Sequence, residues 1–369
     1  MAIESKKILL TVPNLQGQGG VASYYNSVIP YLGYAGFQID LLEIGSWGRK
    51  KNIFKPLHDQ MNFRNACNGD LNMVHINPSL GNKSFWRDGI FAFQAKKNKH
   101  PLLVFFHGWD HDFAQTIEKR YLRFFKNTYA KADGFIVLAS EFKEKLRQWG
   151  VKAPIFVETT TVDEQLLQSF SLAKKHSELL SHVNINILFL SRLDKEKGIL
   201  ETINAIKILI DRDYKIKLTI AGDGIVRKEA EDLTTKLGLS DQVTFIGHVS
   251  GQNKIDTFRH NIIYCFPTSY GEGLPISVLE AMAFGMPVVT TTVGGLKDVF
   301  HDGKMGYFTE SIAPNHIAEQ LEKLIMNSKL SKQISEYNYH YAQENFMASK
   351  VAARIADIYQ HIIGNRYVR

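Results

Sequence analysis

The chain has 369 residues, of which 44% are hydrophobic and 22% charged, and its formal net charge is +7. This length exceeds what one hydrophobic core usually serves, so two domains are expected. No stretch approaches the roughly 18 apolar residues of a membrane span, and the start MAIESKKILLTVP lacks the pattern of a signal peptide. We therefore expect a cytoplasmic protein. Cys67 and Cys265 lie far apart without metal-ligand neighbours, so neither a disulfide framework nor a zinc site is expected.

The excess of positive charge lies entirely in the N-terminal part of the chain. Residues 1–163 hold 21 Lys and Arg against 14 Asp and Glu, whereas the remainder holds 23 against 23. This imbalance favours an anionic partner such as a lipid surface or a phosphate-linked acceptor. A solvated basic surface is the alternative reading. Charge alone leaves nucleic acid formally open, but we expect no nucleic-acid partner.

Short apolar strands alternate with amphipathic helices along the chain, which predicts an α/β protein with parallel sheets. The expected strands of the first run are 8–12, 38–44, 73–76, 102–106, 134–138 and 155–157. Those of the second run are 185–190, 218–221, 243–246, 262–266, 288–290 and 306–308. The polar stretch 169–184 lies between the runs, so we place domains at 1–168 and 185–345 with this linker between them.

The last part of the chain, 346–369, forms a separate prediction. From Ala348 to Ile363, apolar side chains recur at helical spacing, at Val351, Ile355 and Ile358 among others. Such a stripe predicts a helix that packs against another part of the protein.

A glycine-rich loop follows the first expected strand. Gly17, Gly19 and Gly20 precede a helix expected to begin near Val21, and they would let the backbone approach a phosphate at the helix N-terminus. The third glycine of the dinucleotide-binding fingerprint is missing. A tight turn without ligand is the alternative.

His107 directly follows the strand 102–106, so it should project from the carboxyl edge of a sheet. From there it could contact a sugar and shield a reacting centre. A structural histidine is the common alternative, and the neighbours Asp110, His111 and Asp112 also raise the question of a metal, which we do not expect.

The strand 185–190 runs into the loop SRLDKEKG, which places Arg192 and Lys197 at a strand end. Two cations there could neutralise a diphosphate, with Arg192 supplying a fork and Lys197 a mobile charge. In the alternative reading, Asp194 and Glu196 pair with these cations in a solvated loop. Further along the chain, the loops at Gly222 and at Gly247 and His248 also end strands, where they could hold a nucleobase.

The stretch SYGEGLPISVLEAMAFGMP carries the most informative pattern. Gly271 and Gly273 flank Glu272 just before an expected helix, and Glu280 follows two turns later. Small and apolar residues after Glu280 should press the helix against its sheet, so a glutamate there needs a polar role. Paired carboxylates also suggest glycoside hydrolysis, but that chemistry needs opposed groups across a cleft.

The boundaries of this helix are marked on both sides. Pro275 suits the first helical position, and Gly285 followed by Pro287 should end the helix.

Together these residues resemble glycosyltransferase family 4, whose members are retaining enzymes with the GT-B fold and an E-x7-E motif, here Glu272 and Glu280. The resemblance implies two facing Rossmann-like domains with a deep cleft between them. The N-terminal domain would bind the acceptor and the C-terminal domain the nucleotide sugar. The helix in 346–369 would cross back to the N-terminal domain.

The resemblance also implies roles for single residues. Glu280 would bind the ribose hydroxyls, and Glu272 the donor-sugar hydroxyls. Arg192 and Lys197 would hold the diphosphate, and His107 would line the sugar site. The catalytic set is therefore His107, Arg192, Lys197 and Glu272. The remaining donor contacts are expected at Gly19, Gly20, Gly222, Gly247, His248, Gly273 and Leu274.

The expected reaction is transfer of a hexose or N-acetylhexosamine from a nucleoside-diphosphate sugar, UDP rather than GDP, with retention of configuration. No metal and no further cofactor is expected, since two cations and a helix N-terminus can stabilise the leaving diphosphate. The acceptor would be a glycan or lipid-linked glycan in cell-surface polysaccharide assembly. The alternative is a nucleotide-sugar-binding regulator or scaffold without transfer activity.

Contact with the inner face of an anionic membrane is a further expectation. Trp86, Phe91 and Phe93 lie near cationic side chains in the sequence, namely Arg87, Lys96, Lys97 and Lys99. Such a segment could place aromatics and cations on a bilayer. A helix packed on the N-terminal sheet is the alternative.

Overall fold

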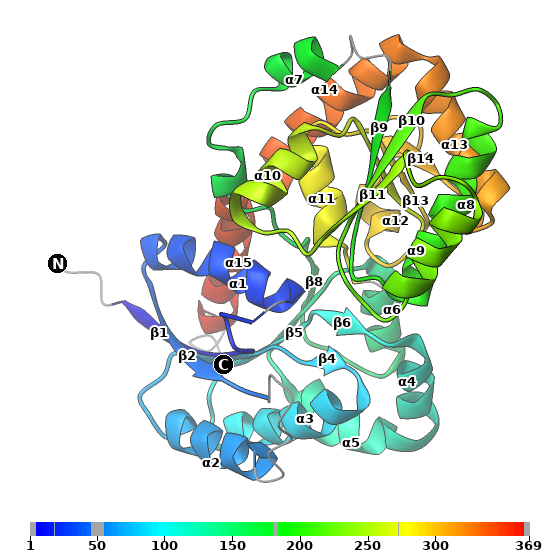
Figure 1. Ribbon diagram of the computed structural model, residues 1–369. Helices are drawn as coiled ribbons and strands as arrows, with labels where there is room; N and C mark the ends of the chain where they lie inside the picture. Colours follow the sequence, from blue (N-terminus) through cyan, green and yellow to red (C-terminus); the bar gives the residue numbers. More distant parts are fainter. Residues whose placement is uncertain (1–4, 18, 46–54, 180–183, 272, 365–369) are drawn as a thin grey trace. The chain divides into compact units, whose positions relative to one another are not determined.

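The computed structural model describes residues 5–17, 19–45, 55–179, 184–271 and 273–364 (Figure 1). Contacts divide them into two compact units. Unit 1 comprises the described residues within Met1–Thr161, Gly271–Leu274 and Ala348–Arg369. Unit 2 comprises those within Val162–Tyr270 and Pro275–Met347. The domain limits expected at residues 168 and 345 concern parts of the chain that fold independently. They stay predictions.

Unit 1 is built on a parallel sheet of six strands. Its order is β2-β1-β3-β5-β7-β8. The strands are β1 Lys6–Val12, β2 Phe37–Glu43, β3 Met73–Ile76, β5 Leu102–Phe106, β7 Gly134–Val137 and β8 Ile155–Val157. All residues of β3, β5 and β7 are buried, as expected for central strands covered on both faces. Two short strands that the sequence did not predict, β4 Ser79–Leu80 and β6 Gly108–Trp109, pair beside it.

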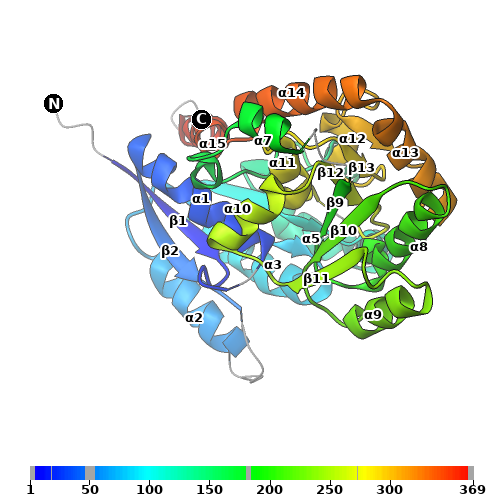
Figure 2. The same cartoon turned by 45° about the horizontal axis from the view of Figure 1, so that its top comes forward.

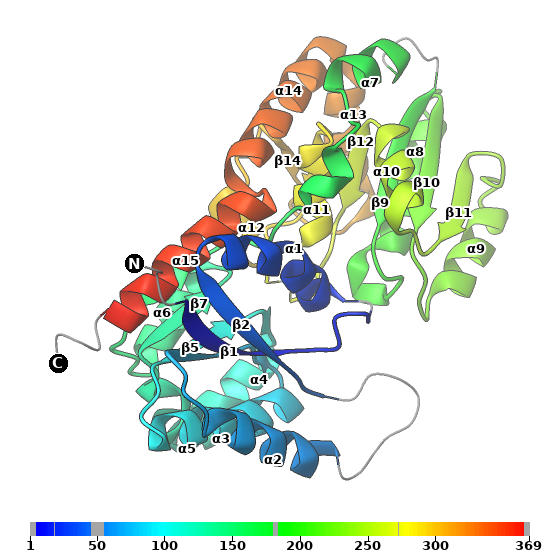
Figure 3. The ribbon, with the colours of Figure 1, turned by 90° about the vertical axis from the view of Figure 1, so that its left-hand side faces the viewer.

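The helices of unit 1 are α1 Gly20–Tyr34, α2 Lys55–Cys67, α3 Asn82–Lys97, α4 His111–Thr116, α5 Leu122–Asn127, α6 Ser140–Gln148 and α15 Ala348–Gly364. Helix α15, drawn in red in Figure 3, packs along α1. Its Tyr359 is fully buried, and its Ile362 lies so close to Gly134 that a Cβ there would come within 2.4 Å of the isoleucine. The expected return of the last helix to the N-terminal part of the protein is therefore confirmed.

Unit 2 repeats the architecture with a parallel sheet in the order β11-β10-β9-β12-β13-β14. The strands from β11 to β13 are labelled in Figure 2. The strands are β9 Ile185–Leu190, β10 Ile216–Ala221, β11 Val243–Gly247, β12 Ile263–Phe266, β13 Val288–Thr290 and β14 Gly306–Phe308. The helices are α7 Leu172–Leu179, α8 Ile199–Ile210, α9 Arg227–Lys236, α10 Gly251–Arg259, α11 Ile276–Ala283, α12 Leu296–Val299, α13 Pro314–Met326 and α14 Ser328–Asn345.

Helix α11 ends as the sequence predicts. Gly285 has φ +66° and donates its N–H to Met282, while the N–H of Met286 reaches the carbonyl of Ala281. These two bonds form a Schellman motif, which satisfies the last carbonyls of the helix. At the other end the helix begins at Ile276, so Pro275 occupies the N-cap and not the first helical position.

The aromatic segment of α3 divides between core and surface. Phe91 is fully buried and stacks on Phe63 of α2 with ring centroids 4.2 Å apart, so its expected place on an exposed surface is wrong. Trp86 and Phe93 are 37% and 54% exposed. The three positions differ because residues five apart along a helix, such as 86 and 91, point in different directions.

The cations expected beside these aromatics also divide. Arg87 forms an ion pair with the buried Asp88, and Lys96 with Asp133, at 2.6 Å each. Lys97 and Lys99 are exposed.

Candidate functional site

The predicted donor loops of unit 2 come together at the carboxyl ends of three neighbouring strands. Arg192 follows β9, Gly222 follows β10 and Gly247 ends β11. The N–H of Gly222 donates to the carbonyl of Gly247 at 2.7 Å, and a Cβ on Gly222 would lie 1.8 Å from the carbonyl oxygen of Ser191. The backbone at Gly222 therefore requires glycine, and the three loops form one edge. His248 is exposed beside them.

Lys197 is held at the same edge by the loop that follows β12. It ends a 3₁₀ turn, Lys195–Lys197, and only 7% of the residue is exposed. Its Nζ lies 4.0 Å from the ring centroid of Tyr270, a cation–π contact. The carbonyl oxygen of Glu196 accepts hydrogen bonds from the N–H groups of Ser269 and Tyr270, at 2.8 and 3.2 Å. These bonds join the cationic loop to the stretch that leads to Glu272.

Arg192 differs from Lys197 in its surroundings. Its side chain is 64% exposed, and its Nε pairs with a carboxylate oxygen of Asp194. The pairing that the sequence left open is therefore present for Arg192. Because the arginine side of this pair is open to solvent, the pairing is screened, and an incoming diphosphate could compete with Asp194 for Arg192.

Glu280 lies on α11 and is 4% exposed. Lys254 of α10 donates to its Oε1 at 2.6 Å, and this ion pair compensates a carboxylate that would otherwise be costly to bury. The sequence indicated a polar role for Glu280 but did not identify Lys254 as its partner. Glu272, the other member of the pair, lies outside the described residues.

In unit 1, Gly19 and Gly20 occupy the start of α1 directly after β1, as predicted, with Gly19 at the N-cap. His107 follows β5. Its Nε2 lies 3.2 Å from Oδ1 of Asn77 and 3.3 Å from the hydroxyl of Tyr25. Burial, with His75 nearby, lowers the pKa of His107 well below its usual range, so the ring is neutral at physiological pH.

Gly273 and Leu274 belong to unit 1 by their contacts. A Cβ on Gly273 would lie 2.8 Å from the carbonyl oxygen of His107 and 2.7 Å from Leu138. The hydroxyl of Thr160 donates to the carbonyl of Leu274 at 3.1 Å. The structure thus brings Gly273 next to His107, a contact that spacing in the sequence could not reveal. It separates the predicted site residues into two groups, one in each unit.

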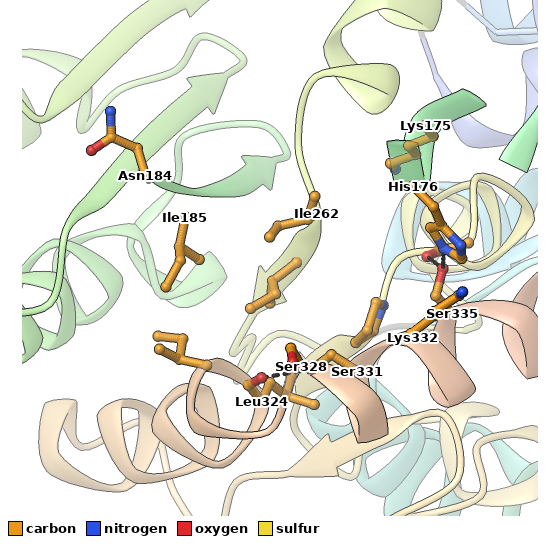
Figure 4. A pocket seen from close by; sticks show the side chains of 14 residues that line it. Lys175, His176, Asn184, Ile185, Ile262, Leu324, Ser328, Ser331, Lys332 and Ser335 are labelled. Carbon is orange, nitrogen blue, oxygen red and sulfur yellow. Dashed lines mark hydrogen bonds between the residues drawn. The ribbon is translucent and has the colours of Figure 1, made fainter. Parts of the chain in front are cut away.

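A cavity of about 240 Å³ in unit 2 lies at the opposite ends of the strands (Figure 4). Ile185 begins β9 and Ile263 begins β12, so the cavity is at the amino edge of the sheet. Lys175 lines it, but its Nζ donates to the carbonyls of Phe258 and Phe284 at 2.9 and 3.0 Å. These carbonyls belong to the C-terminal turns of α10 and α11, where a cation is favourable, so Lys175 has a structural role.

Among the described residues, no group of three or more His, Cys, Asp or Glu side chains is arranged to hold a metal ion. No described helix combines the length and apolar character needed to cross a membrane. The absence of a metal and of a cofactor from the reaction stays a prediction.

Two parallel α/β sheets, with the last helix returned to the first unit, define the GT-B fold, and solved structures agree. Sucrose-phosphate synthase from Thermosynechococcus elongatus matches with a TM-score of 0.79 at 17% identity, over 98% of this chain and 100% of that one. Anabaena HepE, solved with UDP and glucose, matches with a TM-score of 0.73 at 17% identity, over 96% and 99%. At such identities the likeness concerns the fold alone.

Residues 173–341 match the family described as glycosyl transferases group 1. A relative is the capsular polysaccharide biosynthesis glycosyltransferase CapM of Staphylococcus aureus, 32% identical over 187 residues, 50% of this chain and 48% of CapM. Another is the phosphatidyl-myo-inositol mannosyltransferase of Mycobacterium leprae, 28% identical over 178 residues, 48% and 46% of the two chains. The matches thus span about half the length of these curated relatives.

Several residues around the site were not predicted from the sequence. Lys254 and Tyr270 support Glu280 and Lys197, while Tyr25 and Asn77 support His107. Only Asn77 carried a usable signal, because it is a polar residue immediately after a buried strand, the place where ligand-binding residues of parallel sheets occur. The E-x7-E pattern itself stays a prediction.

Proposed function

We propose that this protein transfers a hexose or N-acetylhexosamine from a nucleoside-diphosphate sugar to a glycan or lipid-linked glycan in cell-surface polysaccharide biosynthesis. The observation that carries the proposal is the edge of unit 2 where Arg192, Lys197 and Gly222 meet, since it combines cations with close backbone approach. The family match over 173–341 covers this edge. UDP is the preferred nucleotide, supported by the UDP bound in the HepE structure. The name of CapM supports the polysaccharide context.

In the proposed mechanism the main service of the protein is to stabilise the negative charge that grows on the leaving diphosphate. Lys197 and Arg192 supply cationic hydrogen-bond donors. Glu280 and Glu272 hold donor hydroxyls and position the sugar. The departing phosphate would deprotonate the acceptor hydroxyl on the same face of the sugar, which retains the anomeric configuration, and no metal takes part.

The test of transfer is incubation with individual UDP- and GDP-sugars, with and without glycan acceptors, while nucleotide release is measured. We expect release with at least one UDP-sugar, unaffected by EDTA, and an α-linked product from an α-linked donor by NMR. Folded protein that releases no nucleotide from any donor in the panel would contradict the proposal. An inverted anomer or loss of activity in EDTA would contradict the corresponding part alone.

The role of the cationic edge is tested by Lys197→Ala. Loss of a charge that acts in the transition state should lower kcat by roughly 10- to 1,000-fold. Lys195→Ala is the matched control, because Lys195 is exposed two residues earlier in the same loop. Equal turnover of both variants would remove Lys197 from the mechanism.

The competing proposal is a nucleotide-sugar-binding regulator or scaffold without transfer activity. It is favoured by the pairing of Arg192 with Asp194, since a protein that only binds could leave this cation engaged. The two proposals separate when binding and turnover are measured together. Thermal stabilisation by UDP without nucleotide release from any donor would support the regulator.

Contact with an anionic membrane surface is a further part of the proposal, and it rests on exposed side chains of α2 and α3. Trp86, Ile90 and Phe93 form an exposed stripe on α3, and Leu57 and Met61 one on the adjacent α2. Exposed apolar patches of this kind mark interaction surfaces. Liposome co-sedimentation should increase with the fraction of anionic lipid and fall for Phe93→Ser. Sedimentation that does not depend on anionic lipid would contradict it.

A further inference from the structure

The hydrogen bonds around Asn77 fix the direction of its side-chain amide. Its Nδ2 donates to the carbonyl oxygen of Thr11 at 2.6 Å, and its backbone N–H donates to the Thr11 hydroxyl at 3.1 Å. Thr11 is fully buried in β1 and Asn77 is 8% exposed after β3. Because the amide nitrogen must face the Thr11 carbonyl, Oδ1 is the atom that faces His107.

Oδ1 of Asn77 already accepts one hydrogen bond from a neighbouring side chain. The hydroxyl of Tyr25, on α1, donates to it at 2.5 Å. Burial raises the pKa of Tyr25 well above 10.0, so this hydroxyl keeps its hydrogen. Since that hydrogen is directed at Asn77, the Tyr25 oxygen presents only lone pairs to its other neighbours.

Nε2 of His107 therefore faces two acceptors, Oδ1 of Asn77 at 3.2 Å and the Tyr25 oxygen at 3.3 Å. An unprotonated Nε2 would direct its lone pair at the lone pairs of these two oxygens, which is unfavourable. A protonated Nε2 can donate a hydrogen bond to both oxygens. The ring nitrogen Nδ1 has no hydrogen-bond partner among the residues that the structure describes.

We infer that Asn77 and Tyr25 hold His107 as the neutral Nε2–H tautomer, so that Nδ1 accepts a hydrogen bond from a hydroxyl of the bound sugar. The hydrogen bond from the sugar rests on the proposed function, whereas the tautomer does not. Asn77 and Tyr25 are then positioning residues that act through His107. A histidine in this state cannot donate a proton from Nδ1, so this nitrogen serves as a hydrogen-bond acceptor and takes no part as a general acid.

The tautomer can be measured without activity. Two-bond proton–nitrogen NMR of ¹⁵N-histidine-labelled protein distinguishes protonated from bare ring nitrogens, and a His107→Gln variant assigns the signal. We expect a protonated Nε2 and a bare Nδ1 at neutral pH. A protonated Nδ1 in the wild-type protein overturns the inference, even if transfer activity is found.

Kinetics of an Asn77→Asp variant test the consequence for the reaction. The added carboxylate should raise the pKa of His107, so that Nδ1 becomes protonated as the pH falls and can no longer accept. The other titratable groups at the ring are Tyr24 and Tyr25, which burial keeps protonated, and His75, whose pKa burial lowers to about 3. Among the groups at the ring, only His107 should then change its protonation as the pH falls.

Wild-type kcat/KM should be independent of this group between about pH 6 and 8, whereas Asn77→Asp should lose about 10-fold toward the acid end. Asn77→Ser, which replaces the amide acceptor by a shorter hydroxyl without adding charge, should lose about 10-fold in kcat without a new pH dependence. The control is Asn72→Ser, which removes one side-chain bond to Lys7 ahead of β3. Superimposable wild-type and Asn77→Asp profiles overturn the inference, while a wild type without any turnover contradicts the proposed function instead.

Discussion

Replacement of Lys254 by methionine tests whether the buried carboxylate of Glu280 depends on its partner. The side chains are 22% and 6% exposed, and Nζ and Oε1 are 2.6 Å apart. Breaking a fully buried pair costs about 3–5 kcal/mol, because one charge is left without compensation. Water can reach the partly exposed lysine side, so we expect a smaller loss of about 2 kcal/mol in the free energy of unfolding.

The variant should also bind UDP about 10-fold more weakly, because Glu280 loses the bond that orients it. Urea unfolding and isothermal titration calorimetry measure the two effects. The control is Lys228→Met, which removes a pair with the same 2.6 Å separation but with side chains 80% and 62% exposed. It should change stability by less than about 0.5 kcal/mol.

The double variant Lys254→Met with Glu280→Gln separates the two roles. Without either charge, stability should return to within about 1 kcal/mol of the wild type, since neutral replacement of both partners is often harmless. Affinity for UDP should stay low, because the carboxylate is gone. Wild-type affinity in Lys254→Met, or no recovery of stability in the double variant, would refute the reasoning.

Three further predictions concern stability. Gly198→Ala should lower the free energy of unfolding, measured by urea unfolding, by at least about 2 kcal/mol. The reason is that φ of Gly198 is +79° and that the new Cβ would lie 2.2 Å from the carbonyl oxygen of Pro267. An unchanged free energy of unfolding would contradict this geometry. Burial holds the pKa of Lys175 in the folded protein well below 10.5, so the unfolded chain binds this proton more readily. The free energy of unfolding should therefore rise as the pH increases from the lowered pKa of the folded protein toward 10.5. Lys175→Met should flatten that rise, and parallel curves would contradict the shift. Phe91→Ala should cost about 3–5 kcal/mol whereas the exposed Phe93→Ala should cost under about 0.5, and equal melting curves would contradict their different burial.

The strands were predictable from the sequence, because buried parallel strands give short apolar runs. Six of the twelve expected strands, including 73–76, 102–106 and 185–190, coincide with the observed limits. The position of Arg192 and Lys197 at a sheet edge followed from the same pattern. Helix starts were less certain, as Pro275 shows, because a proline fits both the N-cap and the first turn.

Long-range partners were not predictable. Lys254 lies 26 residues before Glu280, and Asn77 lies 30 residues before His107. Nothing in local spacing connects them, since the contacts depend on which strands and helices become neighbours in space. The place of Phe91 was left between two readings for a related reason: composition showed aromatics beside cations, but only the packing of α2 on α3 decides which ring faces inward.

Unit 1 is assembled from two ends of the chain, and this has a consequence for its synthesis. Helix α15 supplies Tyr359, whose hydroxyl lies 2.7 Å from Nδ1 of His75, and Arg354, which pairs with Glu158. Every residue of unit 2 leaves the ribosome before these side chains do. The first unit to be translated is therefore the last to be completed. Until α15 is made, part of the apolar surface of this unit lacks its cover, and incomplete chains with such exposed surface are prone to aggregate.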